Sequence, residues 1–171
     1  MAKNIIILND NGTYTMTSIQ DKIPAPILTN PTTVAETVVA RWQLPANYIS
    51  TGLSLRVNAA FLSAANGTVI WRLRIGLLGT VADTLVTQLT TSGAQIINAR
   101  GNVYFNLYIP TPTIVNASGY AVMQNAFLGH LTGGIVNATV VPSAPIFINI
   151  TAQISVAAAN VISGAGIDVN Y

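Results

Sequence analysis

Few side chains in this chain could carry out acid–base or nucleophilic chemistry. The candidates are one histidine and five carboxylates: His130, Asp10, Asp21, Glu36, Asp83 and Asp168. A nucleophilic triad needs a base, a group that orients it and a hydroxyl, and a glycosidase needs two carboxylates that flank the scissile bond. The acids lie far apart in the sequence and in no recognisable motif, and His130 is interpreted as a loop or rim residue. The sequence therefore predicts no enzymatic activity.

Sites for metals, phosphates or cofactors also lack a basis in the sequence. The chain has no cysteine, and calcium binding needs several carboxylates or carbonyls at fixed spacing. Segments 79–83 and 164–168 each supply one acid, so both are interpreted as structural turns. Residues 129–134 contain glycines without the Lys-Ser/Thr pair of a phosphate-binding loop, and we expect a flexible loop between strands there. We expect no cofactor and no bound metal.

Positive charge is scarce, and its placement favours contacts with protein. The chain has seven Lys and Arg against five acids, and only 7% of its residues are charged. Blocks of basic residues are absent, so no nucleic-acid partner is expected. Arg72 and Arg74 share one face of an expected strand, with Arg56 on an earlier strand. This face is either solvated or part of an interface, where a planar guanidinium makes directed hydrogen bonds.

Aromatic side chains raise the alternative of sugar binding. Trp42 and Trp71 each lie in an alternating run beside an arginine, and core packing is the expectation for both, with a sugar-binding platform as the alternative. Tyr104 and Tyr108 fall on the side of their strand that is expected to face outward. A receptor- or glycan-binding module is therefore the alternative function, and a concave site with exposed aromatic side chains would favour it.

Alternation of apolar and polar residues predicts the strands that position these side chains. The pattern is clear in residues 53–61, 69–77, 103–109 and 146–156, and weaker in 37–44, 81–89, 119–128, 135–141 and 160–169. Each clear segment has one apolar and one mainly polar face, as a half-buried strand requires. With turn signals between them, these segments predict an all-β fold, an antiparallel β-sandwich of jelly-roll type over residues 34–171.

The turn signal at Asn66-Gly67 bears on how consecutive strands are arranged. A two-residue hairpin at this turn would place Phe61 opposite Arg72, which sets an apolar face beside a polar one. Either the loop has an odd number of residues, or the two strands lie in different sheets. The second arrangement is typical of a jelly roll, in which most consecutive strands switch sheets.

Residues 1–33 differ from the body and are interpreted as an N-terminal arm. The stretches 5–8 and 13–17 flank a turn and are expected to form a hairpin. Prolines between residues 24 and 31 predict a stiff, extended connector, because proline cannot donate to a central strand. Such an arm buries little surface alone, so a neighbouring subunit is its expected support. Besides the three arginines, the candidate interface residues are Ile5, Ile7, Tyr14, Pro24 and Pro26.

The composition as a whole predicts a subunit of an assembly. Hydrophobic residues make up 51% of the chain, and its polar residues are mainly Asn, Thr, Ser and Gln. A soluble monomer ordinarily uses surface charge to stay dispersed. A neutral exterior therefore favours a protein whose surface is covered by neighbours. No apolar stretch is long enough to cross a bilayer as a helix, so no membrane partner is expected.

Two segments resemble the head proteins of tailed bacteriophages. In the first, which begins at Trp71, a strand ends in glycine and is followed by Gly-Thr and a short Ala-Asp turn. In the second, an apolar alternating strand from Ile148 is followed by an Ala/Ser/Asn link and a last strand that ends at Tyr171. The likeness covers roughly residues 68–171 and is to capsid decoration, or cement, proteins of the jelly-roll type.

This resemblance implies a role and no active site. Decoration proteins of this type sit as trimers on the capsid exterior, bind at junctions between major capsid proteins and stabilise the shell against internal pressure. The chain is accordingly expected to be a homotrimer on the virion surface, made in the host cytoplasm, with the major capsid protein as its partner. The proline-rich arm and the low charge depart from the family pattern and leave the location, head or tail, open.

Overall fold

The segments in which apolar and polar residues alternate form β-strands along nearly the whole body. The computed structural model describes the backbone of residues 4–8, 14–18, 23–49, 51–63, 67–91, 99–111, 113–123, 126–137, 143–157 and 160–170. The strands are β1 (Asn4–Leu8), β2 (Tyr14–Ser18), β3 (Ile27–Leu28), β4 (Thr37–Leu44), β5 (Ser54–Ser63), β6 (Val69–Gly76), β7 (Thr84–Thr90), β8 (Arg100–Thr111), β9 (Ile114–Met123), β10 (Ala126–Asn137), β11 (Ile146–Ile154) and β12 (Asn160–Asn170). Across these ranges no helix is long and apolar enough to span a membrane.

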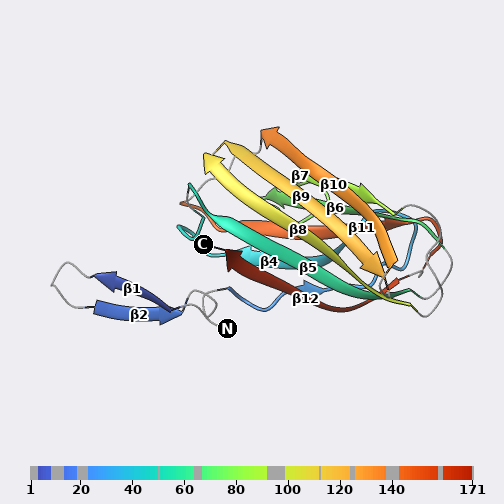
Figure 1. Ribbon diagram of the computed structural model, residues 1–171, viewed down its shortest axis with the longest axis horizontal. Coiled ribbons are helices and arrows are strands. Elements are labelled where there is room, and N and C mark those ends of the chain that lie inside the picture. Colours follow the sequence, from blue (N-terminus) through green and yellow to red (C-terminus); the bar gives the residue numbers. More distant parts are fainter. Residues whose placement is uncertain are drawn as a thin grey trace.

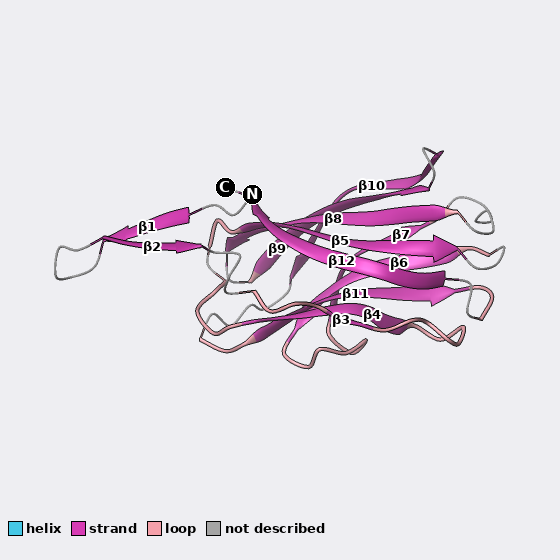
Figure 2. Cartoon of the chain, turned by 90° about the horizontal axis from the view of Figure 1, so that it is seen from below, coloured by secondary structure: helices cyan, strands magenta, loops and turns pink. Residues whose placement is uncertain are grey.

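The body consists of two five-stranded antiparallel sheets packed face to face (Figure 1). Sheet I has the strand order β10-β9-β8-β5-β12, and sheet II has the order β3-β4-β11-β6-β7. Figure 2 shows the two layers nearly edge-on, with the strands of both sheets running along the length of the molecule. The predicted all-β fold, an antiparallel β-sandwich, is confirmed.

The core lies between the sheets and follows the alternation of the sequence. In β5 and β6 every second residue is buried, from Leu55 to Phe61 and from Val69 to Ile75. The rings of Phe61 and Trp71 meet across the two sheets with their centroids 4.9 Å apart. Trp42 is buried in the same core, so the prediction of core positions for both tryptophans is confirmed.

Consecutive strands switch sheets at most connections, as the turn at Asn66-Gly67 suggested. The strands β5 and β6 belong to different sheets, which resolves the mismatch between Phe61 and Arg72 in favour of the second alternative. The connections β4–β5, β7–β8, β10–β11 and β11–β12 also cross between the sheets. Sequential strands stay side by side only in the β3–β4 pair, the β6–β7 pair and the β8–β9–β10 meander among the described body strands.

Several predicted strand boundaries are wrong, most clearly around the glycines of residues 129–134. Residues 129–134 were expected to form a loop, but they lie inside β10, where the register shifts between Leu131 and Gly134. His130 is therefore a strand residue, paired with Tyr120, and not a loop residue. The strands expected at 119–128 and 135–141 are instead β9 and β10, whose bounds are 114–123 and 126–137.

The proline-rich connector closes one side of the sandwich. Its residues Ile27 and Leu28 form β3, which pairs with β4 at the edge of sheet II. Two residues later, the side-chain oxygen of Asn30 accepts a hydrogen bond of 2.8 Å from the backbone N–H of Ile162 in β12, at the edge of sheet I. Pro31 is buried beside these contacts. Part of the predicted arm therefore joins the two sheets of the body.

The rest of the arm is the predicted hairpin. Strands β1 and β2 pair antiparallel, with Ile6 opposite Met16 and Leu8 opposite Tyr14. They form a two-stranded sheet of their own, which projects from one end of the sandwich (Figure 1). The loops that follow β4 and β6 lie at this same end of the body.

Candidate interaction surfaces

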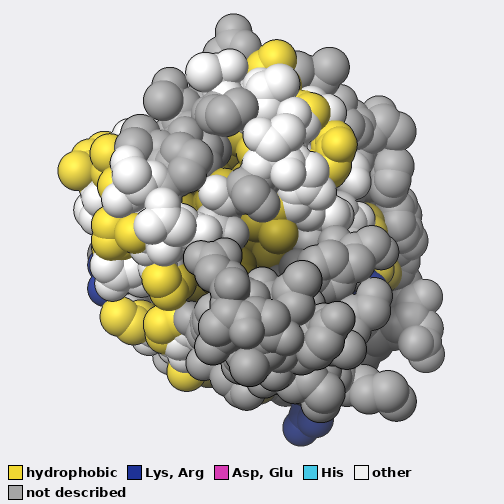
Figure 3. All heavy atoms as spheres, turned by 90° about the vertical axis from the view of Figure 1, so that its left-hand side faces the viewer, with side chains coloured by type: hydrophobic (Ala, Val, Ile, Leu, Met, Phe, Trp, Pro, Cys, Tyr) yellow, Lys and Arg dark blue, Asp and Glu magenta, His cyan; other side chains and the backbone are white. Residues whose placement is uncertain are grey.

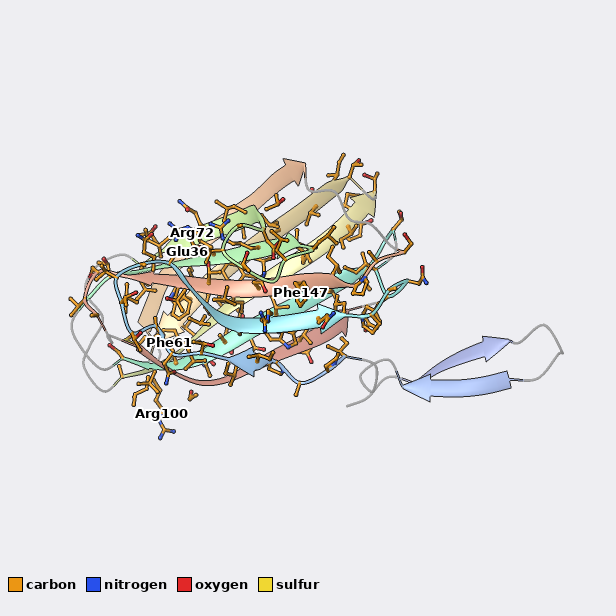
Figure 4. All side chains as sticks on the ribbon, turned by 180° about the vertical axis from the view of Figure 1, so that it is seen from behind. Glu36, Phe61, Arg72, Arg100 and Phe147 are labelled. Atoms are coloured by element: carbon orange, nitrogen blue, oxygen red, sulfur yellow. The ribbon has the colours of Figure 1, made fainter. Side chains whose placement is uncertain are left out.

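A partly buried ion-pair network lies on the outer face of sheet II. Arg72 and Arg74 of β6 point away from the core. Glu36, just before β4, lies beside Arg72 on this face (Figure 4) and pairs with both arginines. The Nε and Nη2 atoms of Arg74 donate to the two carboxylate oxygens of Glu36 at 2.7 and 2.9 Å. The Nη1 atom of Arg72 lies 3.3 Å from Glu36 Oε2. These side chains are only 13% (arginines) and 18% (glutamate) exposed, so this face is largely covered by the chain itself.

The ionisation of Glu36 is set by these neighbours. Burial alone would raise the pKa of this carboxyl group. Hydrogen bonds from Arg74 and from the hydroxyl of Thr151, and the charges of Arg74 and Arg72, outweigh the burial and hold the pKa below its ordinary value. The glutamate is therefore ionised at neutral pH and neutralises much of the positive charge on this face.

We expect the Glu36→Gln variant to lose about 1–3 kcal/mol of stability at neutral pH, because charge-assisted hydrogen bonds are removed. The native-state pKa of Glu36 lies below the unfolded-state pKa, so this contribution is complete above the unfolded-state value of about 4 and is lost as pH falls through the native-state value. Urea unfolding of wild type and variant at roughly pH 7, 5, 4 and 3 measures how this contribution to stability depends on pH.

The difference in stability between wild type and Glu36→Gln should shrink as the pH decreases. Replacing Asp168, which is exposed, by Asn is the matched control and should change neither the stability nor its pH dependence by much. A difference that stayed constant from pH 7 down to about pH 3 would contradict the assignment of a lowered pKa to Glu36.

A buried carboxylate, Asp83, fixes the loop between β6 and β7. Asp83 is 4% exposed. One of its oxygens accepts from the backbone N–H of Leu78 at 3.0 Å, and the other accepts from Thr80 N–H at 3.1 Å and from the side-chain amide of Asn149 at 2.8 Å. The predicted structural turn over residues 79–83 is confirmed by these bonds. The loop is thereby fastened to the outer face of β11.

The same loop presents its apolar side chains to solvent. Leu77 is 51% exposed, Leu78 is 64% exposed and Val81 is 40% exposed. Gly79 has a φ of +67°, and a Cβ atom there would lie 2.9 Å from Arg41 Cδ and 3.0 Å from the ring of Phe147. The absence of a side chain at Gly79 therefore lets the loop lie directly against sheet II.

A shallow pocket adjoins this loop on sheet II. Its volume is about 230 Å³ and it is lined by Pro24, Ala25, Ile27, Arg41, Gln43 and Phe147. The guanidinium of Arg41 lies 5.7 Å from the centre of the Phe147 ring and donates to the carbonyl of Gly79 at 3.3 Å. Pocket and loop therefore form one continuous surface, which we call the end groove: the six pocket residues together with Leu77, Leu78 and Val81.

The outer face of sheet I carries an aromatic cluster. The rings of Tyr104 on β8 and Tyr120 on β9 stack with centroids 4.9 Å apart. Arg56 on β5 lies with its guanidinium carbon 4.6 Å from the Tyr104 centroid and donates to the Tyr120 hydroxyl at 2.9 Å. Tyr108, on the same strand as Tyr104, is 45% exposed. The face therefore presents three tyrosine rings, of which Tyr108 is exposed and the stacked Tyr104 and Tyr120 are partly exposed.

The three arginines that the sequence analysis grouped as one candidate interface lie apart in the structure. Arg72 and Arg74 lie on the outer face of sheet II, whereas Arg56 lies on that of sheet I, so the three cannot form one contact surface. Pro24 is exposed and lines the pocket, and Pro26 is partly buried. The backbones of Ile5, Ile7 and Tyr14 lie in the hairpin, and their side chains fall outside the described part of the chain.

Sequence reasoning missed the groups that organise these surfaces. Glu36, Asp83 and Phe147 were not expected at an interface, and each acts through partners distant in the sequence, such as Asn149 for Asp83. The acids Asp10 and Asp21 lie outside the described residues. Among the residues that are described, no group of three or more His, Cys, Asp or Glu side chains is placed to hold a metal ion.

Comparison with known proteins assigns no family. No protein-family model matches the chain, and no curated protein matches it. The function is therefore inferred from the surfaces described above and from the resemblance noted for residues 68–171.

Proposed function

We propose that the chain is a virion structural protein: a capsid decoration, or cement, protein that binds the outer surface of the major capsid shell as a homotrimer and stabilises it. The observation that carries this proposal is the hairpin β1–β2, which projects from the end of the sandwich as a separate two-stranded sheet. An isolated hairpin is at best marginally stable in water. A surface on another molecule is what would complete it.

The distribution of charge supports an assembly role. Arg72 and Arg74 are paired with Glu36, and Arg56 is engaged by two tyrosines. Several of the few Lys and Arg side chains therefore already have partners within the chain. Surfaces with so little free charge associate mainly through apolar contacts and hydrogen bonds, which is typical of subunits that spend their lifetime in contact with neighbours.

Purified protein mixed with expanded phage shells should cosediment with them and raise the temperature at which they open. The shells are assembled from a tailed-phage major capsid protein, and bare shells measured alone are the control. Light scattering of the free protein should give about three times the 17.9 kDa chain mass. Protein that stayed in the supernatant at saturating concentration would contradict the decoration role.

Occupancy on the shells should change little between low and high salt. Salt screens exposed charges over about 10 Å at 0.1 M, and few exposed charges are available here. Sedimentation at about 0.05 M and about 0.5 M NaCl measures this. A steep loss of bound protein at the higher concentration would instead indicate contacts through exposed cations such as Arg100.

A second candidate function is glycan binding by a tail-fibre module, and the tyrosine cluster of sheet I favours it. Tyr104, Tyr108 and Tyr120 present aromatic rings, with Asn106 exposed beside them. This candidate predicts that the protein binds host surface polysaccharide and that Tyr108→Ala abolishes this binding. The same substitution should leave any binding to shells unchanged. Such a result, or polysaccharide binding by a protein that does not bind shells, would support this candidate over decoration.

A further inference from the structure

The end groove combines a concave pocket with a fixed apolar rim. Leu77 and Leu78 are more than half exposed, although the loop that carries them is held by three hydrogen bonds to the buried carboxylate of Asp83. Such a loop loses little conformational entropy when a partner covers it, because its backbone is already ordered. Exposed apolar side chains on a preorganised support are typical of a binding surface.

The groove also lacks a strong electrostatic preference. The loop residues 77–82 carry no charge. The one charged side chain of the pocket, Arg41, is held by the Gly79 carbonyl and the Phe147 ring, and no ion pair to it is found among the described acids. Figure 3 views this end of the molecule: among the described atoms, hydrophobic side chains and uncharged side-chain or backbone atoms predominate, and Lys and Arg appear at few places. A partner that fits is therefore uncharged and apolar.

We propose that the end groove binds the β1–β2 hairpin of a second copy of this chain. The two strands of the hairpin meet the requirement, because Asn4–Leu8 and Tyr14–Ser18 contain no charged residue, and Asp10 belongs to the segment between them. The register pairs Ile6 with Met16 and Leu8 with Tyr14. A charged segment would bury an unpaired charge against Leu77 and Leu78, which is costly. This inference rests on the proposed self-association and names the surface through which it occurs.

The geometry favours a neighbour's hairpin over the chain's own. Pro24 and Ala25 form part of the pocket wall, so the arm leaves the body at the rim of the groove. The hairpin then extends away from the sandwich that carries the groove (Figure 1). Hairpin and groove are different surfaces at one end of the molecule. The hairpin of each copy would bind the groove of the next, which is a head-to-tail interface, and a ring of such contacts can close around an axis at that end.

Three variants test this contact in the full-length chain. Leu78→Asp places a charge in the groove at a side chain that is 64% exposed, and Ile6→Asp places one in the hairpin. Val161→Asp, on β12, alters a 40% exposed apolar residue outside the groove and is the control. Each of the first two should raise the dissociation constant of the oligomer about 100-fold or more in sedimentation equilibrium, and the control should not. Circular dichroism and thermal melting establish that all three remain folded.

Mixing the two defective variants gives a sharper result. The Leu78→Asp chain keeps its hairpin and the Ile6→Asp chain keeps its groove, so the mixture should form a 1:1 pair that neither forms alone. If the wild type assembled and Leu78→Asp assembled equally well, the docking site would be overturned although self-association stood. The absence of a pair on mixing, with an assembled wild type, would have the same consequence. A monomeric wild type would overturn self-association itself.

Discussion

Replacement of Trp71 by alanine should lower the free energy of unfolding by about 3–5 kcal/mol. The indole is fully buried in β6 and its ring packs against Phe61 of the opposite sheet. Alanine removes both the buried apolar area and the contact across the two sheets, and it leaves a cavity that the surrounding strands fill only in part. Urea unfolding with an unchanged m-value is the appropriate measurement.

Two further variants of β6 separate the contributions. Trp71→Phe should cost less than Trp71→Ala, because a ring is kept and the indole N–H has no hydrogen-bond partner in the described structure. Ile70, the preceding residue, is only partly buried on the outer face, so Ile70→Ala should cost less than Trp71→Ala. A larger loss for Ile70→Ala would mean that the two faces of this strand are assigned the wrong way round.

Asp83→Ala should destabilise the protein by a similar amount, about 3–5 kcal/mol, through a different mechanism. Alanine removes the acceptor for Leu78 N–H and Thr80 N–H and leaves the side-chain amide of Asn149, which is fully buried, without its partner. Gly76→Ala should act on the same site, because a Cβ atom there would lie 2.3 Å from Asp83 Oδ1.

Thermal melting combined with limited proteolysis checks this prediction. The loop at residues 77–82 should become a cleavage site in Asp83→Ala while the rest of the body stays protected. Asp168→Ala removes an exposed carboxylate and should change stability by less than about 0.5 kcal/mol. Equal stability of the two alanine variants would contradict the role assigned to Asp83.

The faces of the strands were predictable from the sequence because burial repeats with a period of two. The alternation in β5 and β6 predicted which side chains enter the core, and the position of the Asn66-Gly67 turn narrowed the arrangement to two alternatives. The N-terminal hairpin was expected from the stretches 5–8 and 13–17, which flank a turn signal. These features depend on residues that are close together in the chain.

Features that join distant residues, or that use glycine without a turn, were not predictable. Glu36 and Arg74 are 38 positions apart, and Asp83 and Asn149 are 66 positions apart, so no local pattern connects them. In β10 and β12, glycines near residues 134 and 164 mark shifts of register inside a strand, although the same residue type signals a turn elsewhere. Local composition cannot distinguish the two uses.

The irregular edges of both sheets limit uncontrolled aggregation. At the edges of sheet I, β10 has two register shifts and β12 has one, and Asn30 occupies an outward N–H of β12. At the edges of sheet II, β7 is shifted opposite β6, and β3 has only two residues between prolines. Regular, open edges would be templates for the endless addition of strands from other molecules. In a chain with so little charge to keep its copies apart, these irregular edges oppose such open-ended addition of strands.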